Sequence, residues 1–304
     1  MNRKNLQQYK GIFLALVSTF LGSLATILYK PIMVGGISPT MVGLIESATI
    51  VLLLLTARPW RLIKSHRRIQ APIILASICQ AVGVISFIFG LSFLDPVTFS
   101  FLTRNQAIFS ILIGCFFLGE RNNILSWVFI ITAVLGSTTL CYADFKSMNP
   151  AGVVFALLFC ISFSLRNYIL RKHKHLPVVI NIFCGYLFTL IFLLILSVCK
   201  PDVICELPSL DIILEIAAIA ISAVLGTFYF FQLAFRYDKL SIITSVRLFS
   251  PFIVIIYFGW AIRYNYSPLK MFGIFLMTLS IITLFYSYKA TSNVKSSEPT
   301  PSLN

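Results

Sequence analysis

Charged residues are scarce in this sequence, and acidic ones are scarcer than basic ones. Only 11% of its 304 residues are charged, whereas soluble domains average about 25%. The 10 acidic residues stand against 24 Lys and Arg, which gives a net charge of +14. A basic balance can indicate nucleic-acid binding, but most of these residues lie in short segments between long apolar runs, where they set membrane topology. We therefore expect a lipid bilayer, and no nucleic acid, as a partner.

Sequence motifs of catalysis and metal binding are also missing. The chain has no CxxC pair, no GxSxG nucleophile motif and no GxxxxGK[ST] loop for nucleotide phosphates. No aspartate falls in the interior of an apolar run, and the three histidines lie in basic loops: His66, His173 and His175. Intramembrane proteases need paired aspartates or a zinc cluster. We predict no enzyme, no cofactor, no metal site and no direct use of ATP.

Long apolar runs dominate what is present. The mean hydropathy is +0.92 and 58% of the residues are hydrophobic, and a helix needs about 20 apolar residues to cross a bilayer. We predict ten such spans, at 10–30, 40–57, 72–93, 97–118, 123–142, 150–170, 178–199, 211–235, 241–262 and 268–288. The chain is then an all-α integral membrane protein with two five-helix segments, 10–142 and 150–288, and a disordered cytoplasmic tail, 289–304, rich in Ser, Thr and Pro.

Two segments with five spans each must insert in opposite orientations, which makes them inverted repeats. A shift of the sequence by 143 positions pairs Arg104 with Arg247. A second local match, at a shift of 141, pairs Lys30 with Arg171. The match of such rare residues in so apolar a chain supports the predicted repeat.

Two stretches carry a family resemblance. The stretch "GLSFLDPVTFSFLTRNQAIFSILIGCFFLGER", 90–121, resembles the third-span end, outer turn, fourth span and terminal Gly-Glu of the EamA family in the drug/metabolite transporter superfamily. The stretch 231–262 is similar to the second-repeat counterpart, with Pro251 as its mid-span proline. The resemblance covers 10–288, and it departs at Glu46, where many relatives carry a basic residue. It implies two inverted repeats, a central cavity and alternating access.

Polar residues inside the spans are the candidate substrate ligands. An arginine at the bilayer centre costs at least about 2.5–3.5 kcal/mol, so it faces protein or a wet cavity, or it reaches back to the surface. We predict that Arg104 and Arg247 line one cavity and offer two cations to a substrate anion. Structural ion pairs are the alternative. Asn105, Gln80 and Tyr229 are weaker candidates for the cavity wall.

Three further residues have interpretations of their own. Arg166 lies shortly before an inner basic loop and is interpreted as reaching to the cytoplasmic surface. Glu46 is the acidic residue clearly inside a span, and it is interpreted as a counter-ion to an arginine, a proton carrier or a residue close to the outer surface. Pro251 lacks an N–H, which frees a backbone carbonyl and favours a kink in its span.

These features favour a secondary transporter that moves a small metabolite across the cell inner membrane. A guanidinium pairs with a carboxylate or phosphate in a planar fork, so we expect an anionic group, as in an amino acid or a related compound. Protons are a partner if Glu46 carries them, while exchange and facilitated diffusion fit equally well. A non-transporting scaffold or receptor, or an intramembrane enzyme, is the alternative. Direction and oligomeric state, monomer or homodimer, stay open.

Loop charge predicts the orientation, because basic residues concentrate on the cytoplasmic side. The bias places the N- and C-termini in the cytoplasm. A reporter that folds only in the cytoplasm should therefore be active when fused after Asn304. A signal at that position from a reporter that works only outside the cytoplasm would contradict the orientation.

Overall fold

The computed structural model is helical along most of the chain that it describes. It describes residues 3–59, 70–118, 124–143, 149–173, 176–199, 208–237, 243–244, 246–261, 267–269, 271–280 and 282–283. Six helices in these ranges are long and apolar enough to cross a membrane, and shorter apolar helices occur at Pro39–Leu55, Trp127–Gly136 and Met271–Ser280. The ten-span arrangement in two repeats stays a prediction. The expected tail, 289–304, lies outside the described residues.

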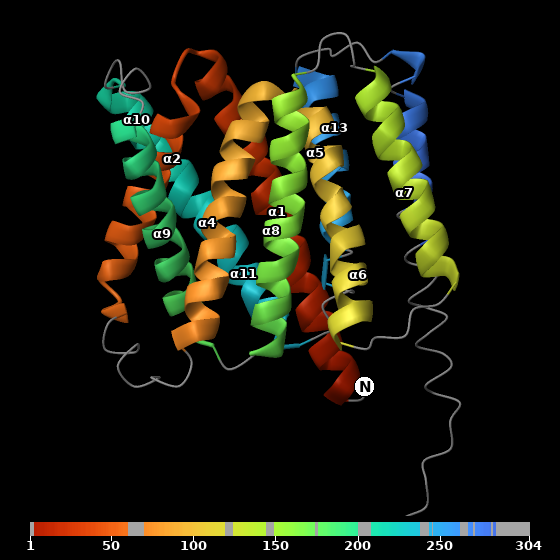
Figure 1. Ribbon diagram of the computed structural model, residues 1–304, viewed down its shortest axis with the longest axis horizontal. Coiled ribbons are helices and arrows are strands. Elements are labelled where there is room, and N and C mark those ends of the chain that lie inside the picture. Colours follow the sequence, from red (N-terminus) through yellow and green to blue (C-terminus); the bar gives the residue numbers. More distant parts are fainter. Residues whose placement is uncertain are drawn as a thin grey trace, which may run out of the picture.

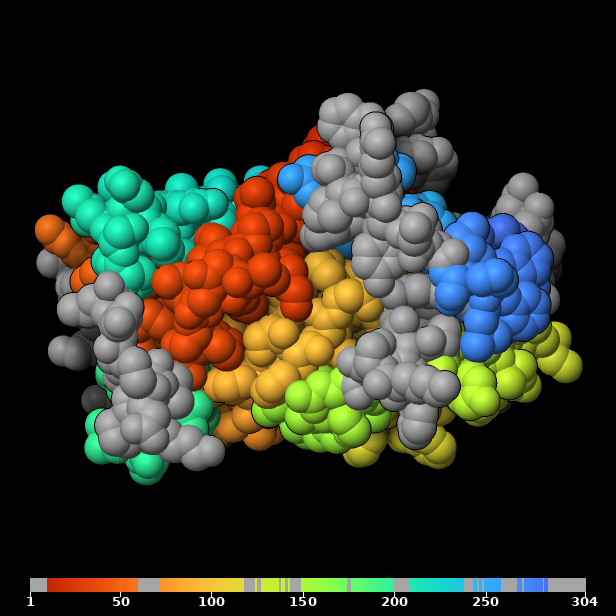
Figure 2. All heavy atoms as spheres, turned by 90° about the horizontal axis from the view of Figure 1, so that it is seen from above, coloured from red at the N-terminus to blue at the C-terminus, as the bar shows by residue number. Residues whose placement is uncertain are grey.

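The helices stand roughly side by side in a bundle (Figure 1). In chain order they are α1 (Arg3–Val34), α2 (Pro39–Leu55), α4 (Gln70–Phe93), α5 (Pro96–Leu102), α6 (Gln106–Leu118), α7 (Ile124–Ala143), α8 (Pro150–Lys172), α9 (Val178–Cys199), α10 (Leu210–Ile219), α11 (Gly226–Ala234) and α13 (Ser250–Ala261). Seen from above, the molecule is elongated, with α9 and α10 at one end and α7 at the other (Figure 2).

Three helices begin with the same local signal, a polar residue followed by proline. The side chain of the polar residue accepts a hydrogen bond from a backbone N–H in the first turn, and proline fits the first helical position because its missing N–H would be unpaired there. The pairs are Ser38-Pro39 at α2, Asp95-Pro96 at α5 and Asn149-Pro150 at α8. These pairs explain where the short segments between helices end and the next helices begin.

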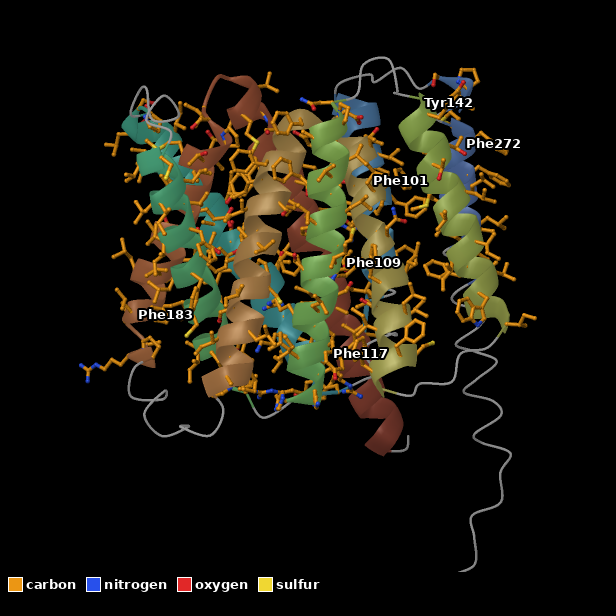
Figure 3. The ribbon with its side chains drawn as sticks, viewed as in Figure 1. Phe101, Phe109, Phe117, Tyr142, Phe183 and Phe272 are labelled. Carbon is orange, nitrogen blue, oxygen red and sulfur yellow. The ribbon has the colours of Figure 1, made fainter. Side chains whose placement is uncertain are left out.

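The outside of the bundle is apolar, as a bilayer requires. Phe117, Tyr142 and Phe272 are 66%, 71% and 53% exposed, and Figure 3 shows where they lie on the bundle. Phe101, by contrast, is fully buried. Exposed aromatic side chains of this size would be unfavourable in water, so these surfaces are suited to lipid.

Three segments near the centre of the bundle depart from α-helical geometry. Thr103–Asn105 (η2) separates α5 from α6 and Arg247–Phe249 (η5) precedes α13, both as 3-10 turns, while Ala220–Leu225 (η4) is π-helical between α10 and α11. Such segments often mark hinges or functional sites. At η5 the sequence supplies the cause, because Pro251 lacks the N–H that would bond to the carbonyl of Arg247 four residues earlier.

Two cations hold helix ends in corresponding ways. Lys30 Nζ, near the end of α1, donates to the carbonyl oxygens of Leu91 and Leu94 at 2.8 and 2.7 Å, where α4 ends. Arg171 Nη1, near the end of α8, donates to the carbonyl of Phe235 at 2.8 Å, where α11 ends. The ends of α1 and α8 lie at opposite sides of the bundle (Figure 1). Each cation thus satisfies carbonyls that a helix end leaves unpaired.

A close approach between α4 and α8 gives a stability test. A Cβ on Gly83 would lie 2.5 Å from Cε2 of Phe163, whose ring is buried. Gly83→Ala should therefore lower the free energy of unfolding by about 1–3 kcal/mol, the usual cost of overpacking. Thermal unfolding of the detergent-purified protein measures this loss.

Gly22→Ala is the matched control, because its Cβ would lie 3.4 Å from Thr227 Cγ2, an ordinary contact distance. Alanine favours a helix over glycine by about 1 kcal/mol, so this variant should be neutral or more stable. Equal losses of stability in the two variants would contradict the packing described between α4 and α8.

Candidate functional site

A central cavity lies at the level of the helix breaks, between α1, α2, α4, α8, α9, α11 and the two 3-10 turns. About 610 Å³ of space is free of protein atoms there, including the part that opens to solvent. Five aromatic rings line it: Phe87, Phe159, Phe163, Tyr186 and Phe228. The acidic and basic side chains that line it in the described part of the chain are Glu46, Arg104 and Arg247. The cavity therefore combines apolar walls with a few charged groups, as is usual for small-molecule sites.

Arg104 joins the two 3-10 turns. Its Nη1 donates to the backbone carbonyl of Arg247 at 2.7 Å, its Nε donates to Ser100 O at 3.1 Å, and its Nη2 donates to Thr103 Oγ1 at 3.3 Å. The carbonyl of Arg247 is the one that Pro251 leaves without its α-helical donor. Ser250 N–H donates to the same carbonyl within the 3-10 turn, so Arg104 supplies its second hydrogen bond, and most of the hydrogen-bonding capacity of Arg104 is used within the protein.

The Arg247 side chain has a different environment. Its guanidinium carbon lies 4.2 Å from the centre of the Phe231 ring, a stacking contact that leaves the N–H groups at the edge of the plane free to donate. Within the part of the chain that the structure describes, no hydrogen bond or ion pair engages these groups. Gly22 faces this guanidinium, and even a Cβ there would stay 3.8 Å from Nη2. Arg247 therefore presents available donors to the cavity.

Backbone carbonyls at the first 3-10 turn accept hydrogen bonds from side chains of α8. Cys160 Sγ donates to the carbonyls of Leu102 and Thr103 at 3.5 and 3.4 Å, and Ser164 Oγ donates to the carbonyl of Gln106 at 3.0 Å. Side chains from a neighbouring element thus complete the backbone hydrogen bonding at each break, as a membrane interior demands. The breaks are fixed features of the fold for this reason.

The interpretation of Arg166 as a surface-reaching residue is wrong. Its side chain is fully buried, with Nε donating to Gln80 Oε1 at 3.0 Å and Nη1 to Asn167 Oδ1 at 3.5 Å. The guanidinium lies 5.1 Å and 5.7 Å from the ring centres of Phe228 and Phe163, two of the rings that form the cavity wall. Burial against these partners holds it inside, although a basic loop follows close by in the sequence.

The sequence does contain a signal that Arg166 is buried. Polar residues lie close to it along the same span, and all three are buried: Ser162, Ser164 and Asn167. Polar residues gathered on a membrane helix indicate contact with other helices, since lipid offers them no partner. The short distance to the basic loop outweighed this signal in the interpretation.

Positive charge gathers around the cavity. Arg247 lies within electrostatic range of both Arg104 and Arg166, and Glu46 is the acidic residue in the described cavity wall. Like charges in a medium of low dielectric constant repel one another strongly unless a counter-charge is present. The cavity is therefore suited to an anionic group near Arg247.

Glu46 faces the cavity, apart from the arginines. It is 2% exposed, and its neighbours are the hydroxyl groups of Tyr29 and Tyr186. In the described ranges no arginine lies within ion-pair distance of it, so the geometry gives no support to the counter-ion interpretation. Glu46 lies in the wall of the cavity, which differs from the expected position near the outer surface. The proton-carrier role stays a prediction.

The structure does not bring the three weaker candidates into the cavity wall. Gln80 is fully buried behind the wall as the partner of Arg166, and Asn105 is buried in the first 3-10 turn. Tyr229 is 41% exposed and packs against Phe230, whereas its neighbour Phe228 faces the cavity. Among the described residues, no group of three or more His, Cys, Asp or Glu is placed to hold a metal ion.

Comparison with known proteins agrees with this architecture. Residues 9–142 match the family model described as "EamA-like transporter family". This segment, less than half of the chain, is similar to that family, which is one of the drug/metabolite transporter superfamily. Together with the long apolar helices, the match supports a multi-pass membrane protein.

The fold comparison extends over nearly the whole chain. A crystal structure titled only "Crystal structure of protein" covers 94% of this chain and 98% of its own, with a TM-score of 0.67 and 13% sequence identity. This likeness concerns the fold alone. No curated protein matches the sequence.

The link between the two breaks can be tested by a double-mutant cycle. Arg104→Ala leaves the carbonyl of Arg247 without its side-chain donor, so we expect a loss of about 1.5–3 kcal/mol in the free energy of unfolding. Pro251→Ala restores an N–H four residues after that carbonyl, so the double variant should lose less than the sum of the two single losses. Unfolding of the purified variants measures the coupling, and strict additivity would contradict the described role of Arg104.

Proposed function

We propose that the protein is a secondary transporter that moves a small metabolite with an anionic group by alternating access. The observation that carries the proposal is the Arg247 guanidinium, which faces the cavity with donors that no described residue uses. A guanidinium offers two parallel N–H donors to a carboxylate or phosphate, and these charge-assisted hydrogen bonds are among the strongest available to a protein. The aromatic wall suits an apolar part of the same molecule.

Arg104 has a positioning role in this proposal. Its bond to the Arg247 backbone fixes where η5 begins, and η5 in turn sets the direction of the Arg247 side chain. The two arginines were expected to act alike, as symmetry-related cations. Their different partners favour a division of roles, with Arg247 binding the substrate anion and Arg104 holding the break that presents it.

The arrangement of the breaks supports alternating access. In such a mechanism, two repeats rock against one another around a site near the bilayer centre. The corresponding contacts of Lys30 and Arg171, and the 3-10 turns at Arg104 and Arg247, support two inverted repeats over 10–142 and 150–288. The cavity at the two turns would then be the site around which they move.

Hydrogen bonds from α1 add to this support. Ser18 Oγ donates to Thr227 O at 2.9 Å, and Ser23 Oγ donates to Ser250 Oγ at 2.8 Å. These bonds tie the first helix to α11 and α13, which belong to the other proposed repeat. A movement between the repeats would have to exchange them, so α1 is the helix on which the two proposed repeats meet.

Substitution of Arg247 tests the proposed function. Arg247→Ala should reduce uptake into proteoliposomes about 100-fold or more, since it removes two charge-assisted hydrogen bonds of about 1.5–3 kcal/mol each. Arg247→Lys keeps the charge without the fork, so we expect a loss of about tenfold. The measured compound is whichever the wild type moves fastest in a panel of amino acids, carboxylates and sugar phosphates.

Arg236→Ala is the matched control, because Arg236 is exposed just after α11 and does not line the cavity. It should transport normally. Unchanged uptake in Arg247→Ala would contradict the proposed function, provided that the variant unfolds at the wild-type temperature.

A further inference from the structure

A second polar group lies at the same cavity, on the side of α2. Glu46 and Tyr186 line the cavity, and Tyr29 neighbours Glu46 without lining it. The three side chains are at most 2% exposed. Both tyrosine hydroxyls neighbour the Glu46 carboxylate and can donate to it. A hydroxyl that donates in this way still has oxygen lone pairs that accept, so the group offers acceptors to a ligand that donates hydrogen bonds.

This group is separate from Arg247, while Tyr186 lies within electrostatic range of Arg166. Gly22 faces Arg247, while Tyr29, further along the same helix, reaches Glu46. Thr26 lies four residues and Tyr29 seven residues beyond Gly22 on this helix. These separations correspond to about 6 Å and about 10 Å along the helix axis. The cavity therefore has an acidic side and a basic side that one small molecule can span.

We propose that Glu46, Tyr29 and Tyr186 form a subsite for an ammonium group of the substrate. This inference rests on the proposed function and deepens it, because the substrate then carries a cation as well as an anion. An ammonium has three donors and no acceptor, which matches a carboxylate flanked by two hydroxyl oxygens that can accept.

The energetic cost of leaving this site without a ligand also favours an ammonium group. A buried carboxylate without a cation is expensive, and the neighbours of Glu46 among the described residues are two neutral hydroxyl groups. The rings of Phe87 and Phe159, which also line the cavity, add faces that attract a cation. A substrate ammonium would satisfy the carboxylate while its anionic group satisfies Arg247, so each end compensates one buried charge.

Counterflow in proteoliposomes without a pH gradient tests the subsite, because exchange of this kind needs no proton coupling. The probes are three matched sets, each with an amino acid, its carboxylate without the amine and its amine without the carboxylate. The sets are phenylalanine, phenylpropanoate and phenethylamine; leucine, isocaproate and isoamylamine; and γ-aminobutyrate, butyrate and propylamine. Wild type should move the amino acid of at least one set about tenfold or more faster than the other two members.

Glu46→Gln is the informative variant, since it keeps the size and removes the charge. It should slow the amino acid about 10- to 100-fold, to the rate of the matched carboxylate, and leave the carboxylate rate unchanged. Glu46→Asp should retain part of the preference. Tyr29→Phe and Tyr186→Phe should each cause a smaller loss. Arg247→Ala should slow the amino acid and the carboxylate alike, which separates the two ends of the cavity.

Three results would overturn the subsite. In the first, Glu46→Gln keeps the wild-type preference for the amino acid, as expected if Glu46 carries only protons. In the second, wild type moves the carboxylates as fast as the amino acids, which leaves the proposed function intact. In the third, Glu46→Gln slows both compounds equally at an unchanged unfolding temperature. Transport of no probe by wild type would overturn the subsite, and the proposed function would be overturned as well only if the sugar phosphates of its panel also fail to move.

Discussion

The hydrogen bond from Arg104 Nη1 to the backbone carbonyl of Arg247 is the contact on which the rest of the site depends. Pro251 has no N–H to offer that carbonyl, which accepts from Ser250 N–H in the 3-10 turn and from Arg104 across the cavity. A side chain from the first half of the chain thus completes the backbone of the second half. This fixes the 3-10 turn from which Arg247 faces the cavity, with its own donors unused by the described residues.

The distribution of charge around the cavity supports the proposed binding site. Three guanidinium groups lie in or behind the cavity wall, and one of them, Arg166, is held against the back of two wall rings. Glu46 lies on another side, among tyrosines instead of arginines. An internal salt bridge between Glu46 and an arginine would have neutralised both groups. Because they are separated, neither group neutralises the other. The empty cavity then carries an energetic cost, which a ligand that pairs with both charges would reduce.

The all-helical character and the notice given to Arg104 and Arg247 follow from local and spacing signals of the sequence. Run length sets the spans, polar-proline pairs set the helix starts, and the match of Arg104 to Arg247 brought two residues of one cavity to notice. It could not predict which side of a helix faces inward, so Tyr229 was chosen where Phe228 lines the cavity. The burial of Arg166 was missed because its partner Gln80 lies on another helix. The ten-span repeat remains a prediction.

The central claim is that the cavity selects a substrate by an anionic group. Transport of matched pairs, each a carboxylate and its uncharged primary amide of nearly equal size, tests this claim most directly in proteoliposomes with wild-type protein. The account predicts that the carboxylate of at least one pair is transported at least about tenfold faster than its amide, since the charge-assisted bonds to a guanidinium are lost in the amide. Equal transport of acid and amide in every pair would contradict it.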